Sequence, residues 1–186
     1  MHATGILKKE HVLIKQVLGL LDNSRQALET GTLVPVVFFE KAGIFCSGFA
    51  DRYHHFKEEF LLFGLLSYKK QGELDTAMGV LRYQHDRCRQ SMTQITRALE
   101  RYDKNDEMAV TLVLEHLGVY VSLLHRHIHM EDHLFFPMAE ESLSTREKES
   151  LTDQFTEQAR QFGDAGRFYD KHQALADELS DILVNR

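Results

Sequence analysis

The sequence predicts an all-α protein, an up-down four-helix bundle with an additional C-terminal helical extension. Apolar residues recur at three- and four-residue spacing along almost the whole chain, as they do on the buried face of a helix. Only Pro35 and Pro137 interrupt the 186 residues, so long helices are possible. Four long periodic segments joined by short breaks predict helices that pack in antiparallel order.

The residues that break the periodic pattern set the bounds of these four helices. The breaks at Gly31 to Pro35, at Gln71-Gly72 and at Asp103 to Asp106 contain glycine, proline and aspartate, which are typical of helix ends and turns. We therefore expect helices at residues 4–30, 36–70, 73–101 and 107–139.

A further helical stretch is expected beyond Pro137. Ser144 and Glu147 form a capping-box pattern, which opens a helix that we expect to run to about Val184 with an interruption near Gly163 and Gly166. The length suits one domain, in which residues 1–140 form the bundle and residues 141–186 form an extension packed on it.

Charge and hydropathy argue against several classes of function. Lys and Arg total 22 against 28 Asp and Glu, and the resulting net charge of −6 repels nucleic acids and anionic membrane surfaces. The apolar run from Phe60 to Leu66 is only seven residues, far below the eighteen or more of a membrane-spanning helix. We expect no nucleic-acid partner and no membrane segment.

Two cysteines, Cys46 and Cys88, lack the spacing of a zinc site and suit a reduced compartment. Together with an N-terminus that lacks the apolar stretch of a signal peptide, they predict a cytoplasmic protein. Eleven histidines are the unusual feature of the composition, and imidazole is the commonest protein ligand of transition metals.

Two segments of the chain align as an internal repeat that carries histidine and glutamate four residues apart. In RYHHFKEEFLLF the pair is His54 and Glu58, and in HRHIHMEDHLFFP it is His127 and Glu131. Residues four apart lie one turn away on the same helical face, so both side chains of a pair can reach one metal centre.

The apolar neighbours on each helical face indicate which histidines point inward. His54 shares a face with Ala50, Leu61 and Leu65, whereas His55 shares its row with Arg52 and Glu59, so we expect His54 inside and reject the rival pair His55 and Glu59. The same test places His11, His85 and His127 inside the bundle. It leaves His125, His129 and His133 facing solvent.

The positions of these residues along the helices predict that they meet at one level. Ligands on antiparallel neighbours lie at equal height when they are equally far from the turn between them. The midpoint of His11 and His54 is 32.5, that of Glu58 and His85 is 71.5, and that of His85 and His127 is 106. All three midpoints fall in the breaks identified above.

Four imidazoles and two carboxylates in a bundle interior suit a pair of first-row metal ions, iron above all. We expect two non-haem iron ions bridged by the two glutamates and by an oxide or hydroxide, each with one open position for a small molecule. Manganese or zinc could occupy the same ligands. The six expected ligands are His11, His54, Glu58, His85, His127 and Glu131.

These residues and motifs resemble the haemerythrin-like HHE cation-binding family over residues 1 to about 140. The resemblance implies an up-down four-helix bundle around a non-haem di-iron site. With one inward histidine fewer than the oxygen-carrying haemerythrins, the chain is more similar to the four-histidine members associated with nitrosative stress and iron-centre repair.

Three functions follow from such a site. The first is binding or sensing of O2 or NO at an open iron position. The second is enzymatic, either a di-iron redox activity or iron-centre repair in oxidative or nitrosative stress. The third is a metal-stabilised structural bundle. The Glu-x-x-His pair of ferritin-like proteins, the His-Glu-x-x-His string of zinc peptidases and the P-loop are all absent from the sequence.

Overall fold

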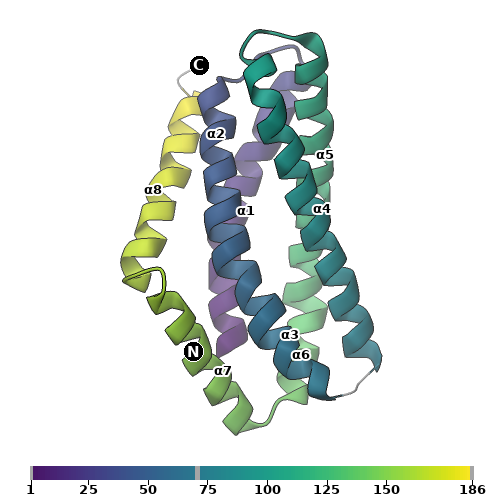
Figure 1. Cartoon of the computed structure of the whole chain (residues 1–186), viewed down its shortest axis with the longest axis vertical. Helices are drawn as coiled ribbons and strands as arrows, with labels where there is room; N and C mark the ends of the chain where they lie inside the picture. The colour runs from purple at the N-terminus through teal and green to yellow at the C-terminus, as the bar shows by residue number, and fades with distance from the viewer. Residues whose placement is uncertain (1, 70–71, 185–186) are drawn as a thin grey trace.

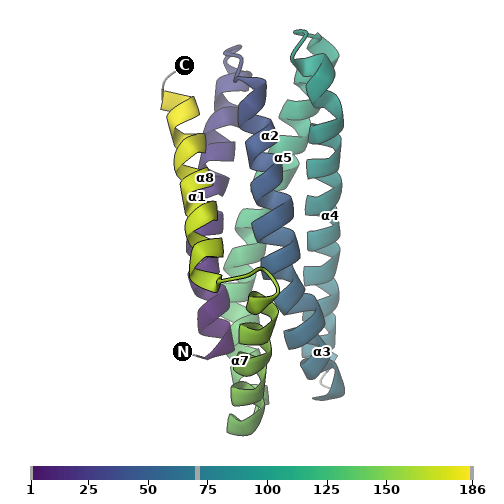
Figure 2. The same ribbon diagram turned by 60° about the vertical axis from the view of Figure 1, so that its left-hand side comes forward.

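The computed structural model describes residues 2–69 and 72–184, and within them every regular element is a helix (Figure 1). The all-α prediction is confirmed. The elements form four long helical segments and two shorter C-terminal helices. The long segments lie side by side and are joined at alternate ends, and the shorter helices run along one side (Figures 1 and 2).

The helix bounds follow the predicted ones closely. The elements, in chain order, are α1 (Ala3–Glu29), α2 (Val36–Phe45), η1 (Cys46–His55), η2 (Lys57–Leu62), α3 (Phe63–Leu66), η3 (Ser67–Lys69), α4 (Gly72–Tyr102), α5 (Glu107–Met130), η4 (Glu131–Phe135), α6 (Phe136–Ser142), α7 (Thr145–Arg160) and α8 (Ala165–Val184). The segments α2 to η3 form the second long helix, and α5 to α6 form the fourth. Of the expected break at Gln71-Gly72, Gln71 lies outside the described residues and Gly72 begins α4.

The expected breaks end helices through backbone geometry that few residues adopt. Gly31 has a φ of +79°, and the N–H groups of Gly31 and Thr32 donate to the carbonyls of Leu28 and Ala27 at 3.0 and 2.8 Å. This Schellman pattern satisfies the last carbonyls of α1 and needs a residue that tolerates positive φ.

Helices α5 and α7 each begin at a side-chain cap. At the start of α5, Asp106 accepts a hydrogen bond from the backbone N–H of Ala109 at 3.1 Å. At the start of α7, Ser144 and Glu147 form the predicted capping box.

Three segments of the long helices are wound more widely than an α-helix. In η1, η2 and η4 the backbone has π-helical hydrogen bonding, in which an N–H donates to the carbonyl five residues earlier. Each wide turn shifts the residues that follow it around the helix axis. The α-helical spacing used to assign faces therefore does not hold there.

The C-terminal helices pack on the outside of the bundle (Figure 2). Helix α7 contacts α1 and η2, and α8 contacts α1 and α2. They meet at the predicted interruption, where Gly163 has a φ of +92°. His172 of α8 is buried against Phe45, Phe49 and Phe168.

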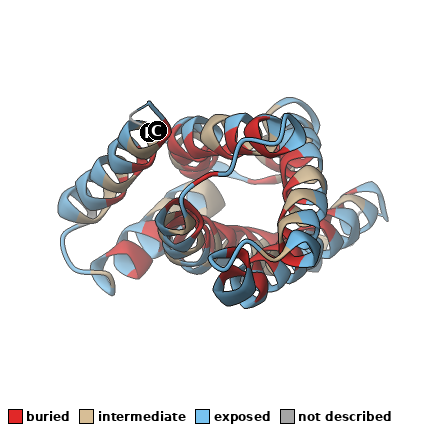
Figure 3. Cartoon of the chain, turned by 90° about the horizontal axis from the view of Figure 1, so that it is seen from above, coloured by how far each residue is buried: buried red, intermediate tan, exposed pale blue. Residues whose placement is uncertain are grey.

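Buried residues line the helix sides that face one another, and exposed residues lie on the outer sides (Figure 3). They form two apolar clusters at different heights. On α1, Leu7 belongs to one cluster and Ile14 to the other, with His11 between them; on α4, His85 likewise lies between Leu81 and Cys88. A polar layer thus separates two dry regions of core.

The fourth long helix differs from one expectation. Averaged over an 18-residue window, the stretch Glu107–Ser142 is long and apolar enough to cross a membrane, although it contains no long uninterrupted apolar run. Here it packs against α1 and α4 as a core helix of the bundle.

Candidate metal centre

The polar layer brings together all six residues that the sequence singled out. They come from all four long helices, and each has 0 or 1% of its surface exposed. Their ligand atoms, together with that of His55, form two groups, within each of which every pair of ligand atoms lies no more than 4.8 Å apart. One group is His11, His54, Glu58 and Glu131, and the other is His55, Glu58, His85 and His127.

The two glutamates lie between the groups. Glu58 Oε1 is 3.3 Å from His54 Nε2, and Glu58 Oε2 is 3.4 Å from His85 Nε2. Glu131 Oε2 is 3.3 Å from His11 Nε2 and 3.1 Å from His127 Nε2. Each carboxylate therefore faces histidines of both groups, as a carboxylate that bridges two metal ions must.

The four oxygens of Glu58 and Glu131 are the strongest sign that cations belong here. All four are buried, and none has a hydrogen-bond partner. A buried ionised carboxylate without a partner costs several kcal/mol. Facing imidazole nitrogens and buried carboxylate oxygens are the donor set of a first-row transition-metal site, so the residues fit a pair of such ions.

His55 is also part of the site, and the prediction that it faces away is wrong. It is only 4% exposed, and its ring stacks on that of His85 with the centroids 3.8 Å apart. The wide turns of η1 place the consecutive residues His54 and His55 both inside the bundle. The groups therefore hold three and two histidines, five in all instead of four.

The histidines are oriented from outside by hydrogen bonds at Nδ1. His11 Nδ1 donates to Asp132 at 2.9 Å, His54 to Glu10 at 2.9 Å, His85 to Glu59 at 2.7 Å and His127 to Gln84 at 2.9 Å. We call these four residues the outer acceptors. A proton at Nδ1 leaves the Nε2 lone pair directed at the centre, as metal-binding histidines need.

Two of the outer acceptors were signalled by the repeat. Glu59 directly follows Glu58, and Asp132 directly follows Glu131, so each half carries a second acid beside its inner glutamate. Glu59 reaches across to His85 on α4, and Asp132 reaches across to His11 on α1. Each half thus supplies both a candidate metal ligand and a partner for a histidine on a neighbouring helix.

A buried lysine next to the site was not foreseen. Lys57 is 1% exposed; its Nζ lies 3.3 Å from the centroid of the Tyr53 ring and forms an ion pair with Glu10. Burial opposes ionisation of Glu10, but the hydrogen bond from His54 and the charge of Lys57 outweigh it and lower the pKa of Glu10. Glu10 is therefore an anion held between His54 and Lys57.

The charges of the site depend on one another. Burial opposes a charge on His54, but the carboxylates of Glu58 and Glu10 raise its pKa to about 10. Burial would raise the pKa of Glu131, but His127 and His11 hold it well below its usual value. Without metal ions, imidazole protons compensate the carboxylates, so binding of metal ions there displaces protons.

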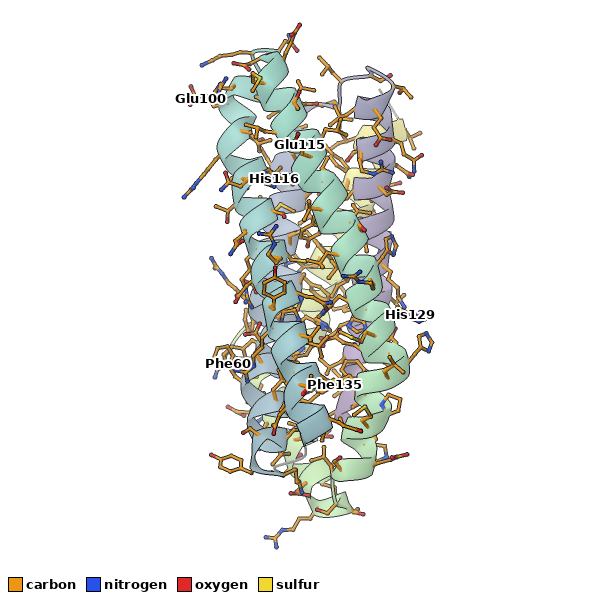
Figure 4. All side chains as sticks on the ribbon, turned by 90° about the vertical axis from the view of Figure 1, so that its right-hand side faces the viewer. Phe60, Glu100, Glu115, His116, His129 and Phe135 are labelled. Atoms are coloured by element: carbon orange, nitrogen blue, oxygen red, sulfur yellow. The ribbon has the colours of Figure 1, made fainter. Side chains whose placement is uncertain are left out.

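The remaining histidines of this region lie outside the site, as predicted. His125, His129 and His133 are exposed, and the side chain of His129 points away from the bundle (Figure 4). The rings of His129 and His133 lie 4.5 Å apart on this outer face.

Comparison with known proteins gives a family match and three curated relatives. Residues 2–139 match the family described as Hemerythrin HHE cation binding domain. The uncharacterized proteins Rv1995 and MT2051 of Mycobacterium tuberculosis and Mb2018 of Mycobacterium bovis are each 25% identical to this chain over 177 residues, which are 95% of this chain and 67% of each relative. No solved structure matches.

Proposed function

The chain belongs to the hemerythrin HHE cation-binding domain family, and from this premise we propose that it is a non-haem di-iron protein that binds or senses O2 or NO at an open iron position. One observation carries the proposal. The carboxylates of Glu58 and Glu131 are buried without hydrogen bonds, and each faces histidines of both groups. Two bridged cations would satisfy all four oxygens.

The two groups of candidate ligands would differ in their roles. His55, His85 and His127 would hold one ion, and His11 and His54 would hold the other, with Glu58 shared between them. Glu131, at 3.3 Å from His11 and 3.1 Å from His127, would be the second bridge. The second ion would have one histidine fewer and therefore more room for a small molecule. A reduced di-iron pair supplies electrons and a coordination position to a bound diatomic molecule.

The surrounding protein would keep this chemistry dry and fixed in place. The apolar clusters on either side exclude water, and the outer acceptors hold the imidazole rings in one orientation. The free, buried thiols of Cys46 and Cys88 support the cytoplasmic location that we propose.

Iron reconstitution tests the proposal. Anaerobic protein loaded with ferrous iron should bind two ions per chain, and stopped-flow mixing with O2 or NO should give a reversible optical change. Catalytic consumption of either gas would instead favour the redox enzyme, and bound iron without any reaction would favour a structural role.

Matched variants separate the centre from adventitious binding. Glu58→Gln keeps the size of the side chain but removes its charge, and it should lower the iron content sharply. The double variant His129→Ala/His133→Ala removes two exposed histidines and should keep two ions per chain. Equal iron content in both variants would refute the proposed centre.

A further inference from the structure

A cleft of about 1310 Å³ runs between α2, η1 and α4, and no part of the proposed gas chemistry explains it. Its outer end lies near Glu100, close to one end of the bundle (Figure 4). Its inner end reaches His55 and Arg89, beside the candidate metal centre. Pockets of about 300–1000 Å³ hold drug-sized molecules, so the volume far exceeds what O2 or NO needs.

Several residues in the walls of the cleft are apolar or have hydroxyls already bonded within their own helix. Met92, Ile44 and Leu99 contribute apolar side chains. Thr93 and Thr96 donate their hydroxyls to the carbonyls of Arg89 and Met92 in their own helix, at 2.8 and 2.9 Å. Such walls favour an apolar body.

The two cysteine thiols that line the cleft are unreactive. Burial raises the pKa of both Cys46 and Cys88 to about 12, so both are uncharged thiols and poor nucleophiles. Both thiols therefore offer an uncharged surface against which a ligand can pack.

No cation is free at the inner end to hold an anion. The Arg89 guanidinium donates from Nε to Asp51 at 2.7 Å, and from its two terminal nitrogens to Glu59 at 2.5 Å and Asp86 at 2.8 Å. Along the whole lining, four carboxylates face three cations: Glu40, Asp51, Glu100 and Asp103 against Arg89, Arg97 and Lys104. The lining therefore has no net positive charge that would attract a carboxylate or phosphate ligand.

One polar atom at the inner end lacks a partner. His55 has only 4% of its surface exposed, and its Nδ1 makes no hydrogen bond. Asp51 Oδ1 lies 3.4 Å from it, within ion-pair distance but without the alignment of a hydrogen bond, and already accepts from Arg89. The other four histidines of the site donate from Nδ1 to a fixed acceptor, so His55 alone has an N–H to offer.

We propose that this cleft binds an uncharged organic molecule with an apolar body and one oxygen acceptor, and that this oxygen accepts the hydrogen bond of His55 Nδ1. The proton on Nδ1 rests on the proposed function, in which Nε2 of His55 faces a metal ion. The molecule would touch the outer edge of that histidine without competing for the open position on the other ion. Its binding would couple an organic ligand to the metal centre.

Glycine replacements test the site in the full-length, iron-loaded protein. Gly43 lines the cleft, and a Cβ there would meet only Thr96 Oγ1, at an ordinary 3.6 Å, so the position admits a side chain and Gly43→Leu should narrow the cleft. Gly79 is an exposed helical glycine with nothing within 4 Å of its Cβ. Gly79→Leu is therefore a matched control with the same change in helix propensity.

The probe is N-phenyl-1-naphthylamine, an uncharged dye that becomes fluorescent in apolar surroundings. We expect saturable binding to the parent chain, at least tenfold weaker binding to Gly43→Leu, and binding to Gly79→Leu within twofold of the parent. No binding to the parent, or equal binding to both variants, would overturn the proposal.

A matched pair of competitors tests the hydrogen bond. 4-Phenyl-2-butanone carries a carbonyl oxygen that n-butylbenzene lacks, so the ketone should displace the dye at about 2- to 10-fold lower concentration. Equal potency would refute the contact with His55. Iron content is measured on the same samples. Dye binding by a protein that takes up no iron would refute the proposed function and leave the ligand-binding cleft standing. Iron binding without dye binding would refute the ligand-binding cleft and leave the proposed function standing.

Discussion

Replacing Lys57 by methionine should destabilise the protein far more than an ordinary surface substitution. The change removes the cation from a buried ion pair and leaves Glu10 ionised in the interior. The side chains are 1% and 5% exposed, so water cannot take over the role of the lysine. Methionine has a similar length and fills most of the same volume, which keeps the packing change small.

The expected loss follows from the kind of pair that is broken. Removing one partner of a buried ion pair costs about 3–5 kcal/mol, because the other charge stays buried without its counter-ion, and Glu10 would keep only the hydrogen bond from His54. We therefore expect the free energy of unfolding to fall by about 3–5 kcal/mol, a large share of the roughly 5–15 kcal/mol that stabilises a typical domain. Contact of Nζ with the Tyr53 ring adds to the loss.

Lys15 offers a matched control. It pairs with Asp132, which accepts from His11 as Glu10 does from His54, but the Lys15 side chain is 47% exposed. Exposed pairs contribute about 0.2–1 kcal/mol, so Lys15→Met should cost no more than that. The assay is urea unfolding followed by circular dichroism on samples of equal metal content.

The result that would refute this reasoning is a loss for Lys57→Met no larger than that for Lys15→Met. A double variant checks the cause. In Glu10→Gln/Lys57→Met no buried charge is left without a partner, so the combined loss should be smaller than the sum of the two single losses. A strictly additive result would show that the two residues act independently.

Three further predictions concern the site and the extension. His55→Ala should reduce bound iron about as much as His54→Ala. Full iron content in His55→Ala, measured by metal analysis, would show that His55 is not a metal ligand. Ser144→Ala removes the cap of α7 and should cost about 0.5–2 kcal/mol in urea unfolding; no change would contradict the capping box. Burial lowers the pKa of His172, so the folded state disfavours its charged form. The stability that the neutral His172 ring contributes is fully present above the pKa of the ring in the unfolded state, about 6.5. It is lost as the pH falls through the lower pKa of the ring in the folded state. Unfolding measured at pH 7.5 and 5.5 should show a smaller acid loss in His172→Leu, and an equal loss would show that His172 does not contribute.

The fold was predictable because its signals are local. Helical periodicity, the positive-φ glycine at Gly31 and the capping box at Ser144 each act within a few residues, and the predicted bounds of the first helix, 4–30, differ from Ala3–Glu29 by one residue at each end. The convergence of His11 with His54 was predictable for a related reason. Once two antiparallel helices and their turn are known, equal distance from the turn sets equal height.

The inward position of His55 could not be predicted in the same way. Assigning faces assumes 3.6 residues per turn, but the backbone of Cys46–His55 is wound more widely. That winding depends on which carbonyl accepts each N–H, and the pattern of residue types does not reveal it. Lys57 and Glu10 were missed because isolated charges belong on the surface, and only the packed structure shows that each has the other as a partner.

The orientation of the histidines suggests why both of the proposed ions should bind, although one group has fewer histidines than the other. A carboxylate that accepts from Nδ1 makes the imidazole a stronger donor at Nε2. In the group with two histidines, both His11 and His54 have such an acceptor at 2.9 Å. In the group with three histidines only His85 has one, because His127 donates to the neutral amide of Gln84 and His55 makes no aligned bond. Stronger imidazole donors in the group with two histidines thus offset the additional histidine in the other group. Iron titration should therefore fill the two positions over a similar concentration range, whereas a single ion at saturation would show that the third histidine decides affinity.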